Sequence, residues 1–246
     1  MPPQTGGVPM RKLLAAALAA VTVFLAVPAV AGADTGTSQV YVTHGLPLES
    51  VLGPGTKVDV YVNGAVAIDD FLFGNTVGPL SLPAATYDVE IRTPDGITTL
   101  ISKSIAVPAG GNFSLVASFV DAAGTPGINV FSNNTAKTRF GSARVALHHA
   151  AAAPAVDIDA GLFPLSRKVP LLKLPLVKNA SNGAAAAFTL PTFLRYTVDV
   201  RVAGTKSVVL PVDNVRLSSK VLTNVYVVGS ASGGTLQPLV VTIPVD

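Results

Sequence analysis

The chain has 246 residues, of which 49% are hydrophobic and 13% are charged, and its formal net charge is +3 at pH 7. It contains no cysteine, which excludes disulfides, thiolate metal sites and a cysteine nucleophile. Beyond the N-terminal segment there is no apolar run of about 18 residues, which excludes a helical protein that spans a membrane several times.

The N-terminal segment, residues 1–31, is typical of a secretory signal peptide. Arg11 and Lys12 form its basic part, residues 13–27 form its apolar part, and Ala29-Val30-Ala31 is a small-residue cleavage site. The pattern predicts a secreted or cell-envelope-associated protein. An uncleaved anchor is the alternative, which the shortness of the apolar run disfavours.

We expect cleavage after Ala31, with Ala33 as the second choice, and both Met1 and Met10 are compatible with the start of this pattern. No cysteine follows the apolar part, so a lipoprotein anchor is not expected. No transmembrane span is expected after cleavage.

Alternation of apolar and polar residues dominates the remaining chain, as in residues 57–63, 86–92 and 196–202. A period of two is typical of half-buried strands, and the 22 Gly and 19 Pro supply turns between them. The strands predicted in this way are 39–44, 57–62, 65–71, 86–92, 98–106, 112–120, 128–131, 144–149, 156–160, 185–190, 196–202, 207–212, 224–230 and 236–243.

One pattern occurs twice, first in Gln39–Gly64 and again in Ala143–Gly161. Each copy has an alternating strand that ends in His, then a turn with Pro, then a strand around V-D-V or V-D-I. The repeat predicts an all-β protein with two tandem immunoglobulin-like antiparallel β-sandwich domains after the signal peptide, at residues 38–133 and 143–246. Ser132–Ser142 is the predicted linker. The spacing pairs His44 with His148, and Asp59 with Asp157, as repeat-equivalent structural positions.

The stretch V-D-V-Y-V-N-G at residues 58–64, followed by L-S-L-P-A-A-T-Y-D-V-E-I-R at residues 80–92, resembles the bacterial secreted family called domain of unknown function 4397 (DUF4397). In the second module, His149-Ala150 and residues 154–157 fit the start of the family's pattern. In the first module, Gly45-Leu46-Pro47 with an insertion departs from it. The resemblance implies a tandem β-sandwich from the cell exterior with no assigned reaction.

Charge divides unequally between the two predicted domains. Residues 40–133 carry three Lys and Arg against eight acids, a net charge of −5, whereas residues 134–246 carry twelve against five, a net charge of +7. A basic module outside a cell suits anionic wall polymers or lipid headgroups. Alternatively, the two modules neutralise each other across their interface, or the charges are simply solvated. The candidate contacts for an anionic polymer are Arg167, Lys168, Lys173 and Lys178.

Residues 162–177 mix these cations with many leucines and three prolines, which exclude a regular helix. We expect an extended edge whose leucines cover the sandwich. The alternative is an exposed flap that binds a partner.

Catalytic patterns are scarce. His148 or His149 with Asp157 is the candidate pair for a hydrolase, but a structural role for His44, His148, Asp59 and Asp157 is the simpler interpretation. The pair Asp69-Asp70 offers too few oxygens for calcium by itself. We therefore expect a non-enzymatic structural or binding protein without metal or cofactor, which does not bind nucleic acid. Its expected partner is an anionic wall polymer or another envelope protein, and carbohydrate binding is the main alternative.

Overall fold

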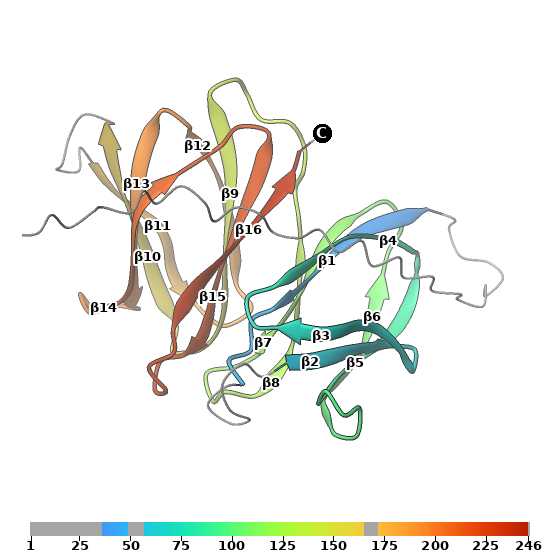
Figure 1. Ribbon diagram of the computed structural model, residues 1–246. Helices are drawn as coiled ribbons and strands as arrows, with labels where there is room; N and C mark the ends of the chain where they lie inside the picture. The colour runs from blue at the N-terminus through green and yellow to red at the C-terminus, as the bar shows by residue number, and fades with distance from the viewer. Residues whose placement is uncertain (1–35, 49–56, 165–171, 246) are drawn as a thin grey trace, which may run out of the picture.

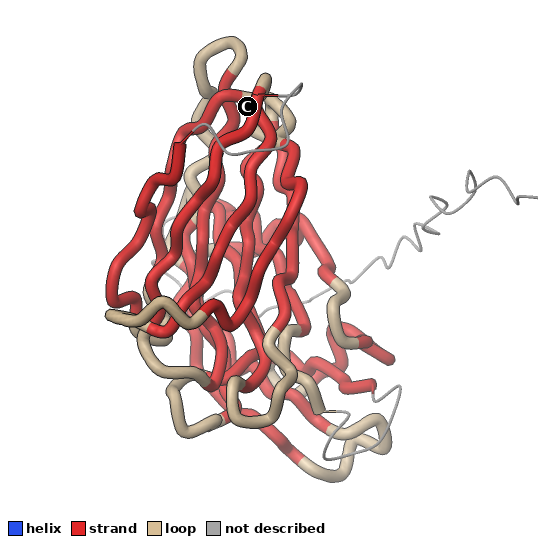
Figure 2. The backbone as a smooth tube through the Cα atoms, turned by 90° about the vertical axis from the view of Figure 1, so that its left-hand side faces the viewer, coloured by secondary structure: helices blue, strands red, loops and turns tan. Residues whose placement is uncertain are grey.

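The computed structural model describes residues 36–48, 57–164 and 172–245, and within these ranges every regular element is a β-strand (Figure 2). Within the same ranges, no helix has the length and apolar character needed to cross a bilayer. The strands are β1 (Thr37–His44), β2 (Lys57–Val62), β3 (Ala65–Leu72), β4 (Thr76–Pro83), β5 (Ala85–Arg92), β6 (Thr99–Val107), β7 (Asn112–Phe119), β8 (Pro126–Ser132), β9 (Ser142–Ala152), β10 (Val156–Pro164), β11 (Leu172–Ala180), β12 (Ala185–Pro191), β13 (Leu194–Val202), β14 (Val208–Arg216), β15 (Val221–Ser230) and β16 (Gln237–Pro244).

These strands form four sheets of four strands each. Strands β1 to β8 make sheets of order β3-β2-β5-β6 and β4-β1-β7-β8, and strands β9 to β16 make sheets of order β11-β10-β13-β14 and β12-β9-β15-β16. The second pair of sheets therefore repeats the strand order of the first pair. The pairs β1–β7 and β9–β15 are parallel, and the other neighbouring strands are antiparallel.

Alternation along the strands builds the interior of each sandwich. In β5, Tyr87, Val89 and Ile91 are buried while Asp88 is exposed, because successive side chains of a strand point to opposite faces. Apolar residues of both sheets form one core in each half of the chain. The chain is thus an all-β protein with two β-sandwiches, as the sequence predicts.

The two sandwiches are stacked, so that the molecule has four layers (Figure 1). The sheet β4-β1-β7-β8 packs against the sheet β12-β9-β15-β16, through contacts of β7 with β9 and with β15. The sheets that contain β2 and β10 are therefore the outer layers.

Two strands, β4 and β11, are absent from the sequence prediction. Both are edge strands of their sheets, and both contain proline. Proline lacks a ladder donor and is tolerated at sheet edges, so the usual strand signal is weak there. The extended edge predicted for residues 162–177 is confirmed in part. Residues 165–171 lie outside the described residues, and β11 forms an extended edge on which Leu176 packs against the core whereas Leu172 is 50% exposed.

Candidate functional site

The two sandwiches meet along a seam formed by β1, β7 and β8 on one side and β9, β15 and β16 on the other. Two apolar clusters cross it, and each draws side chains from both halves of the chain. Their buried members are Val116, Phe131, Ala150, Tyr226 and Val228 in one cluster, and Tyr41, Ala146, Leu222 and Ile243 in the other.

Small residues bring the backbones of the two sandwiches close together. Strand β9 is buried almost throughout its length because it is covered on both faces. At Gly45, which directly follows β1, a Cβ atom would lie 2.9 Å from Cγ1 of Val228 in the second sandwich. The seam therefore requires glycine at this position.

Three aromatic rings stack at the centre of the seam. The ring centroids of Phe131 and His148 are 4.3 Å apart, and those of His148 and Tyr226 are 4.7 Å apart with nearly parallel planes. Phe131 belongs to the first sandwich, whereas His148 and Tyr226 belong to the second. The stack thus ties the halves together.

A chain of buried polar groups runs beside these rings. The ring nitrogen Nε2 of His148 lies 3.3 Å from Oδ1 of Asn224, and Nδ2 of Asn224 donates a 2.8 Å hydrogen bond to Oδ1 of Asn133. Nδ2 of Asn133 in turn donates to Oγ of Ser114 at 2.9 Å. These four side chains are buried. Such groups cost free energy to bury unless paired, so the chain favours one alignment of the sandwiches.

A further bond crosses the seam near one end. Nδ2 of Asn182 donates to the carbonyl of Ala151 at 2.7 Å and to the carbonyl of Phe119, in the first sandwich, at 3.0 Å. The seam is therefore pinned by polar contacts at two separate places.

Burial keeps the titratable groups of the seam neutral. It lowers the pKa of His148 to about 4, although the contact with Asn224 opposes this. It also raises the pKa of Tyr226 to about 12, with Ser114 and Asn224 acting in the opposite direction. At neutral pH the seam thus carries an uncharged imidazole and an uncharged phenol.

Sequence reasoning missed Asn133, Asn224 and Tyr226. The sequence does contain one signal of the seam. Residues 143–152 of β9, A-R-V-A-L-H-H-A-A-A, do not alternate strictly between apolar and polar residues. A strand of this kind is typically buried on both faces.

The proposed pairing of His44 with His148 needs a correction. The backbone N–H of His44 donates to Asn75 at 3.0 Å and its carbonyl accepts from Gly74 at 2.8 Å. His149, not His148, makes the equivalent bonds, to Ala184 at 3.0 Å and from Gly183 at 2.8 Å. A shift of one residue moves a side chain to the opposite face of a strand, so His148 faces the seam whereas His44 and His149 face inward.

The two inward histidines bond to backbone carbonyls. Nδ1 of His44 lies 3.1 Å from the carbonyl of Phe71, and Nε2 of His149 lies 3.2 Å from that of Pro154. Burial lowers the pKa of both, and these hydrogen bonds oppose the shift.

Asp59 and Asp157 occupy equivalent positions, each opposite an arginine of the neighbouring strand. Oδ1 of Asp59 accepts from the N–H of Asp70 at 3.0 Å, and Oδ1 of Asp157 accepts from that of Asn179 at 2.9 Å. Both donors have positive φ, 53° and 51°. Each carboxylate therefore holds an irregular point of the adjacent edge strand.

The hydrolase pair is not assembled. His148 and His149 lie on β9, whereas Asp157 lies on β10 in the outer sheet. His148 bonds to an amide oxygen, His149 bonds to a backbone carbonyl, and Asp157 accepts from the N–H groups of Asn179 and Gly204. A general base needs its partner within hydrogen-bond reach, which this arrangement does not provide.

Oxygens of Asp59, Asp69 and Asp70 lie within 4.8 Å of one another. Nζ of Lys57 already pairs with Asp70 at 2.6 Å. Calcium takes six to eight oxygens, so three carboxylates beside an ammonium group do not make a metal centre.

The four predicted polymer contacts are not one described group. Arg167 and Lys168 lie outside the described residues, while Lys173 and Lys178 lie on β11, the edge of the outer sheet. Lys173 is 3.7 Å from Asp199 of β13, and the charge of Lys178 helps to lower the pKa of Asp157. Acids therefore accompany both lysines.

Opposite charges do not join the sandwiches in the described part of the chain. The four ion pairs there lie within one half or the other, and the seam contains apolar and neutral polar side chains. The charge difference between the halves is thus not used at their contact.

The comparison with known families decides the relationship. The sequence profile described as "Domain of unknown function (DUF4397)" matches residues 38–159, from β1 into β10. The chain belongs to the DUF4397 family. The matched range covers the first sandwich and the strand–turn–strand start of the second, in which its pattern recurs. No curated protein matches this DUF4397 chain.

Three solved structures are weakly similar. The TIE protein of Bacillus anthracis has 13% identity and a TM-score of 0.23 over 79% of this chain, which spans about a third (34%) of that protein. A DUF3823 family protein from Bacteroides ovatus has 10% identity and a TM-score of 0.23, and the match covers 73% of this chain and 98% of that protein. The fimbrial anchor protein Mfa2 from Porphyromonas gingivalis has 11% identity and a TM-score of 0.26, and the match covers 85% of this chain and 98% of that protein. These likenesses carry no argument about function.

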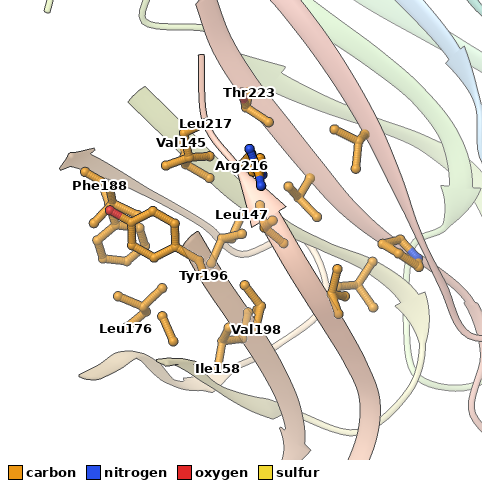
Figure 3. Close-up of a pocket in the computed structure, with 18 of the residues that line it drawn as sticks. Val145, Leu147, Ile158, Leu176, Phe188, Tyr196, Val198, Arg216, Leu217 and Thr223 are labelled. Atoms are coloured by element: carbon orange, nitrogen blue, oxygen red, sulfur yellow. The ribbon is translucent and has the colours of Figure 1, made fainter. Parts of the chain in front are cut away.

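Each sandwich of this DUF4397 protein encloses an apolar cavity between its sheets, of about 410 Å³ in the first and about 160 Å³ in the second. Figure 3 shows Phe188, Tyr196 and Val198 around the second cavity. The hydroxyl of Tyr196 donates to the carbonyl of Pro191 at 2.7 Å, and the equivalent Tyr87 donates to Pro83 at 2.9 Å. With their polar atoms paired in this way, both rings complete the apolar interior.

A third, polar concavity of about 450 Å³ lies at the start of the linker. Its lining has no charged side chain and consists of Thr37, Gln39, Gly110, Gly111, Asn112, Phe113, Ser132, Asn133 and Thr135. Neutral donors and acceptors beside one aromatic ring suit a neutral polar ligand better than an ion.

Proposed function

We propose that this DUF4397 protein is a non-enzymatic structural module of the cell exterior, in which two sandwiches act as one rigid body. The observation that carries the proposal is the seam, with its bond from Asn224 to Asn133 and its ring stack of Phe131, His148 and Tyr226. Close side-chain packing of this kind opposes hinge motion between the halves, which supports the proposal. Such a body fixes the distance between whatever its two ends bind.

The proposed location outside the cell is supported by the signal-like sequence of residues 1–31, which lie outside the described residues. The mass of the protein recovered from culture medium or envelope fractions tests this part. A mature N-terminus at Gly32 would support the proposed location outside the cell. A cytoplasmic protein that keeps residues 1–31 would contradict it.

The chain has no cysteine, so a pair of introduced cysteines can be spin-labelled without background. Ile97 lies 81% exposed between β5 and β6, and Lys206 is exposed in the turn between β13 and β14. Pulsed electron paramagnetic resonance on the Ile97→Cys/Lys206→Cys protein is expected to give one narrow distance distribution. A broad or bimodal distribution in the otherwise unchanged protein would refute a rigid body.

Carbohydrate binding is the second candidate, and the uncharged polar concavity favours it. Retention on insoluble cell-wall polysaccharide, lost in Gln39→Ala and kept in Lys206→Gln, would support it. Equal retention of both variants, or no retention of the unchanged protein, would eliminate this candidate.

A further inference from the structure

One end of the second sandwich combines exposed phenylalanines with cations. Phe140 is fully exposed (107%) and Phe193 is 66% exposed, whereas most large apolar side chains of this size are placed in cores. Arg139, Arg216 and Lys220 are also exposed. Arg139 directly precedes Phe140, Arg216 pairs with Arg195 two residues after Phe193, and Lys220 precedes β15, whose Leu222 pairs with Arg144 of β9. We call the two phenylalanines and the three cations Arg139, Arg216 and Lys220 the basic aromatic end.

Backbone hydrogen bonds hold the two phenylalanines next to each other. The N–H and the hydroxyl of Thr192 both bond to the carbonyl of Gly141, at 2.8 Å and 3.1 Å. Gly141 directly follows Phe140, and Thr192 directly precedes Phe193. The two rings therefore project from neighbouring turns.

The turn that carries Phe140 is itself well defined. The N–H of Ser142 donates to the carbonyl of Arg139 at 3.1 Å, and Gly141 has φ of 74°. Positive φ at the third position of a turn favours glycine. Arg144 also donates to the carbonyls of Asn134 and Ala136, at 2.7 Å and 2.6 Å, which fixes the approach to this turn.

In the described turns at this end, every charged side chain is positive. These turns are residues 133–141, 192–193 and 217–220, and they contain Lys137, Arg139 and Lys220 but no Asp or Glu. Val245 donates its N–H to the carbonyl of Lys220, and Asp246, which follows it in the sequence, lies outside the described residues. Among the acids of the outer sheet, Asp159 and Asp199 pair with Arg201 and Lys173, and the charges of Arg201 and Lys178 lower the pKa of Asp157. Asp213 of β14 is exposed three residues before Arg216, so it is the acid of this sheet that comes nearest in the chain to the basic aromatic end. The cations of these turns therefore differ from Lys173 and Lys178, which lie close to acidic side chains.

We propose that the basic aromatic end docks onto the surface of a lipid bilayer with anionic headgroups. The cations complement the headgroup charge, and the phenylalanine rings enter the boundary between headgroups and acyl chains. A soluble anionic polymer would satisfy the cations but offers no apolar layer for two exposed rings. The bilayer is thus the partner whose chemistry matches both features.

Sedimentation with vesicles tests the proposal on the full mature chain. Binding to vesicles of equimolar phosphatidylcholine and phosphatidylglycerol is expected, with much weaker binding to pure phosphatidylcholine. Binding should fall as NaCl rises from about 0.05 to about 0.5 M, because salt screens exposed charges.

Two sets of variants separate the contribution of the cations to vesicle binding from that of the phenylalanines. Arg139→Gln/Lys220→Gln is expected to lower the partition coefficient about twenty-five-fold, since each cation near an anionic surface contributes a factor of about five. Phe140→Ser/Phe193→Ser is expected to lower it about tenfold or more. The matched controls are Lys206→Gln, at the opposite end of the same sandwich, and Ile97→Ser, on the first sandwich, and both should bind as the unchanged protein does.

Several results would overturn the proposal. These are no binding to anionic vesicles, equal binding to neutral and anionic vesicles, or unchanged binding of the double phenylalanine variant. Stronger binding to soluble polyphosphate than to vesicles, insensitive to the phenylalanine changes, would identify a polymer instead. Circular dichroism of each variant shows that lost binding is not lost folding.

Discussion

Nδ2 of Asn224 donates a 2.8 Å hydrogen bond to Oδ1 of Asn133, which lies 91 positions earlier in the chain and belongs to the other half of the molecule. Both side chains are buried, Asn224 completely. The bond thus connects the two sandwiches in the place where water is excluded.

Asn224→Ala is expected to lower the free energy of unfolding by about 1–3 kcal/mol, because it removes the partner of His148 and leaves the buried Oδ1 of Asn133 with only its longer, 3.3 Å bond from the hydroxyl of Ser114. Urea unfolding followed by fluorescence or circular dichroism measures this loss. Asn134→Ala, at an exposed neighbouring position, is the control and should change the free energy by less than about 0.5 kcal/mol. Equal effects of the two changes would contradict a special role for the buried amide.

Gly45 tests the close approach of the sandwiches separately from hydrogen bonding. A Cβ atom there would lie 2.9 Å from Val228 and 3.2 Å from the carbonyl of Ala117. Gly45→Ala should therefore destabilise the protein by about 1–3 kcal/mol through overpacking. Gly233→Ala, whose Cβ would meet no atom closer than 3.3 Å, should be nearly neutral in the same urea titration. A neutral Gly45→Ala would show that the halves do not press on this glycine.

His148 makes the stability depend on pH. Its pKa of about 4 in the folded protein lies below its ordinary value of 6.5, so the unfolded chain binds the proton more readily. The free energy of unfolding should consequently fall as the pH drops from about 6.5 to about 4, by roughly 3 kcal/mol in total from this group.

His148→Gln keeps a donor for Asn224 but does not titrate in this range, so it should flatten the dependence. Urea unfolding at several pH values between these limits compares the two proteins. His44 and His149 also have lowered pKa values, and they leave part of the slope in place. Identical slopes for both proteins would contradict a neutral, buried His148.

The equivalent acids Asp59 and Asp157 should respond oppositely to neutralisation. Backbone donors lower the pKa of Asp157, whereas burial and the neighbouring Asp69 and Asp70 raise that of Asp59. At pH 7 the ionised form of Asp157 is stabilising and that of Asp59 is costly. Asp157→Asn should therefore lower the melting temperature at pH 7, and Asp59→Asn should leave it unchanged or raise it.

The direction of the pKa shift of Asp157 also determines how the effect of its substitution on the melting temperature changes as the pH falls. The contribution of Asp157 is present above its ordinary pKa of 3.8 and is lost as the pH falls through its lower folded value, so its variant should differ least from the unchanged protein in acid. Equal decreases in melting temperature at pH 7 for the two variants would contradict the opposite shifts.

The sequence predicts the sandwiches well because their outer sheets alternate, as Tyr87, Val89 and Ile91 do in β5. It predicts the seam poorly, because contacts between distant segments leave no local period. The predicted equivalence of His44 and His148 is wrong by one residue, because His44 is equivalent to His149. The strand register is set by the backbone hydrogen bonds of these two residues, and counting residues in the sequence does not determine it.

The basic aromatic end was also out of reach from sequence. Phe140 and Phe193 are far apart in the chain, and the pairing of β12 with β9, together with the bonds between Thr192 and Gly141, makes their turns neighbours. The crowding of cations in residues 167–178 pointed to a different place, where the acids of β10 and β13 lie beside Lys173 and Lys178.

Differential scanning calorimetry tests most directly that the seam makes one cooperative unit of the two sandwiches. The mature protein is expected to unfold in a single transition, with equal calorimetric and van't Hoff enthalpies. The Gly45→Ala/Asn224→Ala protein should show two separated transitions. Two transitions in the unchanged protein, each assignable to one sandwich, would contradict the account.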